Sequence, residues 1–331
     1  MRFSATFYSL LTGMAATLVL QGCGSQPPLV NLPAAFHQSL GLAGQASTGD
    51  SWMLPEAGHD DLLYVLTADF PQMMVLSYPK GKSVGKINGG FGHDAFGLCV
   101  DRQQDVWVAA ESDLHKFVLT EYAHGGIHRK DRVFDKAGRG MGCAIDPTSG
   151  DLAIVNWYGP ATSQGNIAVD SFASRSTTIY QDPKIYQYYA AAYDSAGDLF
   201  VVGQDQAYAP KFAELPHGAS KFVEFKVHLG TPAARDVFWD GQYVVLAYLG
   251  GNALLDRYSI SGSKATLHDE IKLSDAYTPV WVEGSRVIGG GEWYLLYWTY
   301  PGGVFKKMFQ GIHLQDPIAV AVSRGTQARV K

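Results

Sequence analysis

The side chains that could do chemistry in this 331-residue chain recur along it at regular distances. Acids, amides and aromatic residues follow short apolar segments. The candidate ligand-binding residues are Asp69, His93, Asp94, Glu111, Asn156, Trp157, Tyr158, Asp205, Arg235, Tyr248, Tyr277 and Glu292. Aromatic rings interleaved with a few acids and amides suit a pocket for a small molecule or a glycan-type ligand. The alternative is that they are ordinary polar loop residues.

Established catalytic and metal motifs are missing from the sequence. The ten histidines form no H-E-x-x-H, and neither Cys-x-x-Cys nor G-x-S-x-G occurs. Oxygen ligands for Ca²⁺ or another divalent ion are available at Asp69, Asp94, Glu111, Asn156, Asp205 and Glu292. They form no contiguous calcium loop, and the alternative is that they are solvated acids. The sequence therefore favours a protein without catalysis and requires no cofactor.

A motif that returns about every 45 residues must position these side chains. Each copy has an apolar strand, a tight acidic turn and a second strand. The turn acids Asp101, Asp146, Asp194 and Asp240 are 45, 48 and 46 residues apart, and Glu283 follows after 43. This period of short strands predicts an all-β fold, a β-propeller with one four-stranded antiparallel blade per repeat.

A second recurring element sets the number of blades. Six turns, most of them rich in Pro or Gly, are expected to join the third strand of a blade to its fourth, at residues 78–81, 122–125, 172–174, 215–218, 260–262 and 300–302. The sequence therefore predicts six blades. The first blade, at residues 62–88, has only three strands, so the apolar segment Pro317–Ser323 is expected to complete it and close the ring.

The N-terminus indicates export. Residues 1–22 combine Arg2 with an uncharged apolar run, which is too short for a comfortable membrane span and predicts a signal peptide. Leu20-Gln21-Gly22-Cys23 resembles the bacterial lipobox, so Cys23 is the predicted lipidation site; the alternative is an ordinary secretory signal. Residues 23–60 are expected to be a flexible tether, 61–325 the propeller and 326–331 a tail. We expect a lipid-anchored protein at the periplasmic or outer-membrane face.

The net charge limits the classes of binding partner, and the two remaining cysteines raise the question of a disulfide. The formal net charge is −5 and no run of Lys or Arg exceeds a pair, so nucleic acid is not an expected partner; we expect a monomer. Cys99 and Cys143 form an even pair, which in an exported protein suggests a disulfide. Cys99 lies two residues before its turn acid and Cys143 three, an offset that places them on opposite strand faces and argues against a bridge. Both alternatives stay open.

Several motifs carry a resemblance to a known family. They are Y-P-x-G-K at 78–82, E-Y-A-H-G-G at 121–126, G-C-A-x-D-P-x-x-G at 142–150, D-x-x-G-x-L-F-V at 194–201, A-E-L-P-x-G at 213–218 and W-D-G at 239–241. With these, about four fifths of the chain resembles the six-bladed propellers of the NHL-repeat and gluconolactonase-like, or TolB-like, group, and within it uncharacterised exported bacterial lipoprotein propellers. The resemblance implies the fold and no particular activity.

The lactonases of that group hold a divalent metal through a Glu, Asn and Asp set, and this set is not recovered here. The leading hypothesis is therefore a lipid-anchored envelope propeller that binds a small molecule or a protein partner at the channel mouth. The alternative is a metal-dependent hydrolase of the lactonase type.

Overall fold

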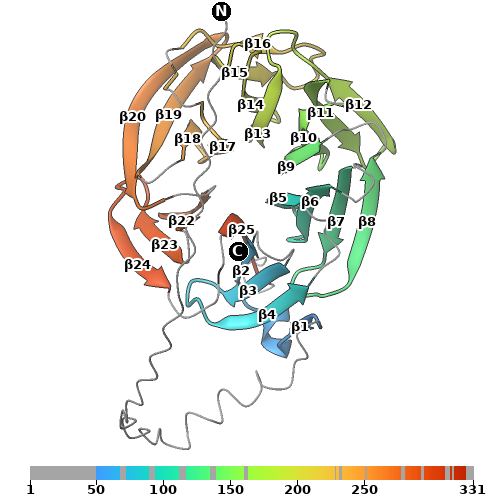
Figure 1. Ribbon diagram of the computed structural model, residues 1–331, viewed down its shortest axis with the longest axis vertical. Coiled ribbons are helices and arrows are strands. Elements are labelled where there is room, and N and C mark those ends of the chain that lie inside the picture. Colours follow the sequence, from blue (N-terminus) through green and yellow to red (C-terminus); the bar gives the residue numbers. More distant parts are fainter. Residues whose placement is uncertain are drawn as a thin grey trace, which may run out of the picture. The chain divides into compact units, whose positions relative to one another are not determined.

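The computed structural model describes residues 50–67, 72–88, 94–111, 117–134, 139–159, 163–227, 229–230, 233–249, 252–276, 280–291, 294–309, 314 and 317–325. These residues form six antiparallel sheets arranged as a ring, which confirms the predicted six-bladed β-propeller (Figure 1). Each blade begins at the central channel and ends at the rim. The repeat of about 45 residues therefore corresponds to one blade.

The blades follow the order of the chain, apart from the last strand. Blade 1 contains β1 (Trp52–Met53), β2 (Leu62–Thr67), β3 (Gln72–Ser77), β4 (Ser83–Asn88) and β25 (Pro317–Ser323). Blade 2 contains β5 (Asp94–Val100), β6 (Val106–Glu111), β7 (Phe117–Tyr122) and β8 (Arg129–Phe134). Blade 3 contains β9 (Arg139–Ile145), β10 (Leu152–Tyr158), β11 (Gln164–Ser171) and β12 (Ser176–Tyr180).

The second half of the ring repeats this plan. Blade 4 contains β13 (Gln187–Tyr193), β14 (Leu199–Gln204), β15 (Pro210–Leu215) and β16 (Val223–Glu224). Blade 5 contains β17 (Asp236–Trp239), β18 (Val244–Tyr248), β19 (Asn252–Ser261) and β20 (Lys264–Ser274). Blade 6 contains β21 (Trp281–Glu283), β22 (Arg286–Gly290), β23 (Leu295–Thr299) and β24 (Phe305–Phe309).

The burial of each strand follows its position in the blade. All six residues of β2 and all six of β14 are buried, because the second strand of a blade packs against a neighbouring blade on each face. The outermost strands β12 and β24 are mostly exposed. Continuous apolar runs in the sequence therefore mark the inner strands, and polar runs mark the rim.

The predicted closure of the ring is confirmed in blade 1. β25 pairs antiparallel with β2, and Tyr64 lies opposite Ala321. The end of β25 also reaches blade 2, since the Ser323 hydroxyl donates to the Gln104 carbonyl at 2.6 Å and lies 2.5 Å from His124 Nδ1. The two ends of the described propeller are thus held together in one sheet.

The N-terminal boundary of the propeller differs from the expected one. Residues 23–60 were expected to be a tether, but β1 pairs with β4 as a fifth strand, and the 3-10 helix η1 (Pro55–Gly58) follows it. Ala57 of η1 is fully buried against the core of blade 1. The tether was placed there because its composition is rich in small residues, but Trp52 and Met53 contribute backbone hydrogen bonds and apolar contacts that composition does not reveal.

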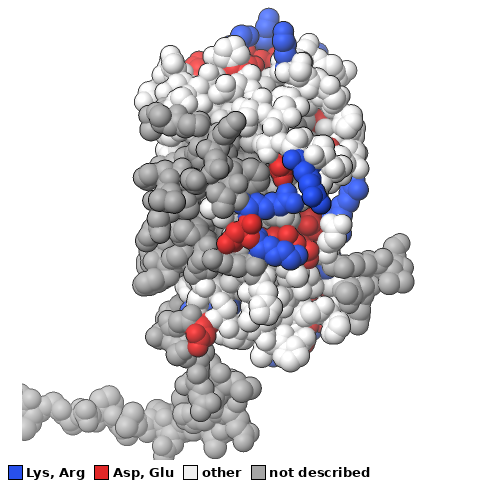
Figure 2. Space-filling view, turned by 90° about the vertical axis from the view of Figure 1, so that its right-hand side faces the viewer, with Lys and Arg blue, Asp and Glu red and all other residues white. Residues whose placement is uncertain are grey.

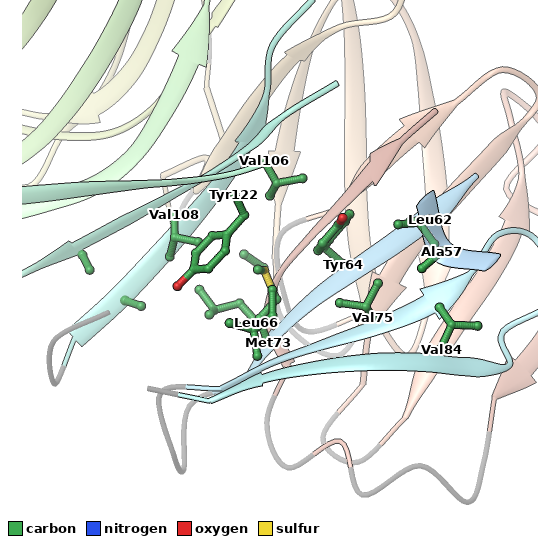
Figure 3. Packing of buried hydrophobic residues seen from close by; sticks show 14 residues of the cluster. Ala57, Leu62, Tyr64, Leu66, Met73, Val75, Val84, Val106, Val108 and Tyr122 are labelled. Carbon is green, nitrogen blue, oxygen red and sulfur yellow. The ribbon is translucent and has the colours of Figure 1, made fainter. Parts of the chain in front are cut away.

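The core lies between adjacent blades. One cluster joins Tyr64 and Leu66 of β2 to Val106 and Val108 of β6, with Tyr122 beside them (Figure 3). These side chains are fully or almost fully buried, so each contact between blades excludes water and contributes about 1.5 to 3 kcal/mol per large apolar side chain. Similar clusters lie between the other blades.

Two kinds of turn close the blades at one end of the ring, which we call the turn face. The acidic turns join first and second strands, and the Pro/Gly turns join third and fourth strands, as predicted. Gly81 and Gly218 have φ values of 75° and 73°, a conformation that residues with a Cβ rarely adopt. The opposite end, which we call the mouth face, carries the loops between blades and those between second and third strands.

A disulfide joins Cys99 of β5 to Cys143 of β9. The offset of one residue had argued against this bridge, and that reasoning was wrong. It assumed that the two side chains must lie on the same face of their strands to meet, whereas the strands belong to successive blades that face each other. The face of blade 2 that points toward blade 3 packs against the face of blade 3 that points toward blade 2. Two cysteines on opposite faces of equivalent strands therefore meet between the blades.

Candidate functional site

The central channel contains a cavity of about 270 Å³. The inner strands β5, β9, β13, β17, β21 and β25 all contribute to its wall. Most lining residues are small or apolar, such as Gly97, Ala191 and Val237. The polar groups are few, and the charged ones are Arg235 and Asp236 at the start of β17. A largely apolar cavity with a few convergent polar groups is the usual form of a small-molecule site.

Arg235 is an exposed cation at the mouth end of this cavity. Its guanidinium carbon lies 4.1 Å from the centre of the Tyr189 ring, a cation–π contact. No carboxylate among the described residues forms an ion pair with it. Burial raises the pKa of the Tyr189 hydroxyl, although Arg235 acts in the opposite direction. The positive charge is therefore held in place by an aromatic ring and available to an anion.

Asp236 follows Arg235 in the sequence, and the charge of its carboxyl changes near neutral pH. Its carboxyl accepts the amide of Val237 at 2.9 Å. Burial raises its pKa to about 7, although the amides of Val237 and Val280 act to lower it. Below that pH the carboxyl is mostly neutral, so it does not cancel the charge of Arg235.

Aromatic side chains surround this end of the channel. Trp157 and Tyr158 end β10, their ring centres are 4.8 Å apart, and Tyr158 meets Tyr186 edge-on at 6.3 Å. Trp157 also packs on the cluster that contains Tyr189, and the hydroxyls of Tyr158 and Tyr208 lie close enough to Tyr189 to influence its pKa. The structure therefore brings together three predicted residues, Trp157, Tyr158 and Arg235, on one side of the mouth.

Two other predicted residues, Asn156 and Asp205, form contacts within their own blades. Asn156 is fully buried and donates to Asn166 at 2.8 Å, within blade 3. Asp205 accepts the amides of Ala207 and Ala209 at 2.9 Å each and so shapes the β14–β15 turn. Burial acts to raise the pKa of Asp205, but these amides and Lys211 hold it below its usual value. The contacts of Asp205 use the carboxylate that the sequence interpretation assigned to a ligand, whereas the buried Oδ1 of Asn156 has no hydrogen-bond partner among the described residues.

Tyr248 lies outside the central channel. It ends β18 and lines a separate cavity of about 630 Å³ between blades 4 and 5, together with Asp256 and Tyr258. Burial, with the nearby Glu270 carboxylate, raises the pKa of Asp256 to about 6. The prediction grouped Tyr248 with the mouth because it ends a second strand, but its side chain points between the blades.

The remaining predicted residues cannot be placed in this site. Asp69, His93, Tyr277 and Glu292 lie outside the described residues. The backbones of Asp94 and Glu111 are described, and the two residues are opposite each other in the pairing of β5 with β6. Within the described residues, no group of three or more His, Cys, Asp or Glu side chains is arranged to hold a metal ion.

Sequence reasoning missed one aromatic residue of the mouth in its loop survey. Tyr208 is 76% exposed and has a positive φ of 64° in the turn after β14. Tyr208 is the fourth residue of the turn that begins at Asp205, and its amide donates to the Asp205 carbonyl at 3.1 Å. The available sequence signal was an aromatic residue three positions after a candidate acid.

Comparisons with known proteins show the fold alone. No protein-family model matches the chain, and no curated protein sequence matches it. A chain from the nidogen–laminin complex is 12% identical, with 80% of this chain and 98% of that chain covered and a TM-score of 0.61. A functionally unknown protein from Desulfotomaculum acetoxidans is 10% identical, with 80% and 99% covered and a TM-score of 0.54. The propeller domain of Cps50 (Swd1) from Myceliophteria thermophila is 12% identical, with 81% and 87% covered and a TM-score of 0.53.

Proposed function

We propose that this protein is a non-enzymatic binding propeller that takes a small anionic molecule with an apolar body into its central channel. The observation that carries the proposal is the Arg235 guanidinium, held on the Tyr189 ring at the mouth of a largely apolar cavity. A carboxylate at this place would form a charge-assisted hydrogen bond with the guanidinium. The apolar body would then contact the alanine and valine side chains of the inner strands.

The size of the cavity limits the ligand. A volume of about 270 Å³ is slightly below the usual range for drug-sized ligands. The aromatic rings of Trp157 and Tyr158 lie near Tyr189, outside the described lining of the cavity, and would add a surface for a ring or an alkyl group that extends beyond it. A short fatty acid or a small aromatic acid fits these limits better than an extended chain.

The binding experiment uses hexanoate and its neutral analogue hexanamide, measured by titration calorimetry. We expect hexanoate to bind and hexanamide to bind at least tenfold more weakly, because only the acid carries the charge that Arg235 recognises. Arg235→Ala should lower hexanoate affinity at least tenfold. Arg102→Ala, which removes an exposed arginine from a turn between β5 and β6, is the matched control and should bind like the wild type.

The proposal fails if Arg235→Ala binds hexanoate as well as the wild type does. It also fails if the protein with added Ca²⁺ or Zn²⁺ hydrolyses a panel of lactones, because that result would establish the metal-dependent hydrolase. Among the candidate ligands of such a metal, Asp205 already accepts backbone amides of its own turn.

The pH dependence offers a second test. Asp236 has a pKa of about 7, so it becomes negative as the pH rises past that value and opposes an anionic ligand. Hexanoate affinity should therefore fall between pH 6 and pH 8 in the wild type. Asp236→Asn keeps the shape without the charge, and its affinity should stay constant over the same range.

The location of the protein belongs to the same proposal. The motifs of residues 78–82 and 142–150 support membership of the NHL-repeat and TolB-like group, and Leu20-Gln21-Gly22-Cys23 supports lipid anchoring at the envelope. No helix within the described residues is long and apolar enough to span a membrane. Mass spectrometry of the N-terminal peptide should detect acyl chains on Cys23, and Cys23→Ala should move the protein from the membrane fraction to the supernatant.

A further inference from the structure

Several interfaces between blades hold an arginine near the turn face, buried at Arg257 and partly exposed at Arg132 and Arg324. Between blades 2 and 3, Arg132 of β8 pairs with Asp170 of β11 at 2.5 Å. Its guanidinium lies 4.3 Å from the Phe172 ring centre and 6.0 Å from the Trp107 ring centre. Figure 2 shows this flank of the ring, which carries β8 and β12, with basic and acidic side chains next to one another.

Two further interfaces repeat this combination of one guanidinium, carboxylates and an aromatic ring. Between blades 5 and 6, Arg257 pairs with Asp240 at 3.2 Å and with Asp269 at 3.1 Å, and it faces the Tyr300 ring at 5.6 Å. Between blades 6 and 1, Arg324 pairs with Asp61 at 2.6 Å and also with Glu283. The chain itself therefore shows which chemical group suits the space between two blades.

The interface between blades 4 and 5 has the acids and the rings but lacks the cation. A cavity of about 540 Å³ opens there at the turn face, and we call it the blade 4/5 cavity. Its wall includes Asp194, Asp198, Phe200, Glu214, Trp239 and Gln242. None of the described residues that line it is Lys, Arg or His.

Glu214 is the unmatched group in this cavity. It is only 8% exposed, and no described residue donates a hydrogen bond to its carboxyl or pairs with it. Glu214 lies opposite Phe200 on one side and Val223 on the other. The carboxyl lines the open cavity without a donor from the described residues, so a cationic ligand that supplies the donor gains a charge-assisted hydrogen bond on binding.

Blade 2 shows how the same position is satisfied elsewhere. Glu121 lies opposite Trp107 in β6, as Glu214 lies opposite Phe200 in β14. Its neighbour on the fourth strand is Lys130, which pairs with it at 3.2 Å. In blade 4 the corresponding neighbour is Val223, and β16 is only two residues long. The position of the cation is taken by an apolar residue, so the cavity of about 540 Å³ has no basic residue in its described lining, whereas the corresponding cavity of about 440 Å³ between blades 2 and 3 is lined by Arg132.

Asp194 and Asp198 add negative electrostatic potential to the cavity. Each of them already accepts at least one hydrogen bond from a backbone amide. Asp194 accepts the amides of Ala196 at 2.8 Å and Asp198 at 3.0 Å, and Asp198 accepts the amide of His217 at 2.6 Å. Burial, and then the charges of Asp198 and Asp194, raise the pKa of Glu214 to about 7. The cavity thus concentrates negative charge beside the rings of Phe200 and Trp239.

We propose that the blade 4/5 cavity binds a guanidinium group, which takes the place that Arg132, Arg257 and Arg324 occupy between other blades. This site is separate from the central channel and does not depend on the function proposed there. Glu214 accepts the N–H groups of the ligand, and Phe200 and Trp239 provide the aromatic surface on which a planar cation packs. The group belongs either to a free organic cation or to an arginine side chain of a peptide.

The experiment titrates the purified propeller with butylguanidinium and with butylurea, its neutral analogue of the same shape. We expect butylguanidinium to bind and butylurea to bind at least tenfold more weakly, because a hydrogen bond between two charged groups exceeds its neutral counterpart by this factor. Glu214→Gln should lower butylguanidinium affinity at least tenfold. The peptide Gly-Gly-Arg-Gly-Gly is titrated in parallel, and tighter binding of the peptide identifies an arginine side chain as the source.

Two further variants control for the fold and for surface charge. Glu121→Gln neutralises the equivalent carboxylate of blade 2 and should leave butylguanidinium binding unchanged. Val223→Lys supplies an internal cation next to Glu214 and should abolish binding while the circular dichroism spectrum stays that of the wild type. The proposal is overturned if butylurea binds as well as butylguanidinium, or if Glu214→Gln and Val223→Lys both keep the wild-type affinity.

Discussion

The interface between blades 2 and 3 and the interface between blades 4 and 5 are built on one plan and differ in one respect. Both place a glutamate of the third strand opposite an aromatic residue of the second strand, beside an acidic turn. Between blades 2 and 3, Lys130 and Arg132 neutralise the acids. Between blades 4 and 5, no described basic residue lines the cavity. Equivalent glutamates of the propeller are therefore paired with a cation in blade 2 and unpaired in blade 4.

This difference suggests that the first interface contributes to the stability of the fold and the second to ligand binding. An interface whose charges are all paired holds two blades together and leaves little for a ligand to gain. An interface with a buried carboxyl and an open cavity is less favourable in the free protein, and a cation can restore the missing interaction. The fourth strand decides between the two, since β8 is six residues long and β16 is two.

The largest effect is expected where the ring closes, because β25 is buried along almost its whole length. Ala321→Asp places an unpaired charge at a fully buried position of β25 and should lower the free energy of unfolding by about 5 kcal/mol. Leu267→Asp, at a 45% exposed position that lines the cavity containing Tyr248, should change it by less than about 0.5 kcal/mol. Urea denaturation of both variants provides the measurement. Equal effects would show that the two regions are packed alike.

Removing an internal cation should be nearly as damaging. Arg257 has a side chain that is 9% exposed, between Asp240 and Asp269. Arg257→Met leaves buried carboxylate without its partner and should cost about 4 kcal/mol in urea denaturation. Lys130→Met removes a lysine whose side chain is 76% exposed, and it should cost less than about 1 kcal/mol. A small effect of Arg257→Met would remove the distinction between satisfied and unsatisfied interfaces.

The disulfide between blades 2 and 3 is expected to have the next largest effect. It closes a segment of 44 residues, for which the loop-closure entropy corresponds to at most about 4 kcal/mol of stabilisation. Reduction of the wild type, or the double substitution Cys99→Ala with Cys143→Ala, should lower the unfolding midpoint in the same way. The double variant should no longer respond to a reductant, and any remaining response would indicate a different pairing.

Neutralising Glu214 should stabilise the protein, in contrast to the three changes above. Its folded-state pKa of about 7 lies above the usual 4.5, so the folded state retains its proton while the unfolded chain loses it. Stability contributed by this group is present below pH 4.5 and is lost as the pH rises to about 7. Glu214→Gln should therefore match the wild type at pH 4.5 and exceed it by about 2 kcal/mol at pH 8.

Comparing the wild type with the Glu214→Gln variant separates the titration of Glu214 from that of other carboxyl groups. Asp236 and Asp256 also have raised pKa values, of about 7 and about 6, and they contribute in the same direction to both proteins. The difference in unfolding free energy between wild type and variant, measured at each pH by urea denaturation, removes their contribution. A constant difference from pH 4.5 to pH 8 would show that Glu214 is not the group with the raised pKa.

Local sequence signals were sufficient for the turns and for the number of blades. The acids of the turn repeat predicted the first-to-second strand turns, and Asp101, Asp194 and Asp240 each accept backbone amides there. The Pro/Gly turns predicted the remaining hairpins, because positive φ at residues such as Gly81 restricts the choice of amino acid. Both signals act over a few residues, and so they can be recognised without knowing the contacts.

The candidate site was only partly predictable. Arg235 lines the central channel, and Trp157 and Tyr158 lie near its partner Tyr189, whereas Tyr248 faces a cavity between blades and Asn156 lies inside a blade. Strand periodicity locates the end of a strand but does not tell which of its last two residues points toward the channel, since β-bulges shift the register in β5, β9 and β13.

By itself, the sequence determined that this chain forms a ring of six blades closed by its last strand, because the strand pattern and turn residues depend on neighbours close in sequence. Only the tertiary structure decided which charges meet. Contacts between the facing sheets of successive blades decide the roles of several side chains. They bring together Cys99 with Cys143 and Arg132 with Asp170, and they leave Glu214 unpaired. Those partners are tens of residues apart, and electrostatic interaction depends on distance in space rather than on position along the chain.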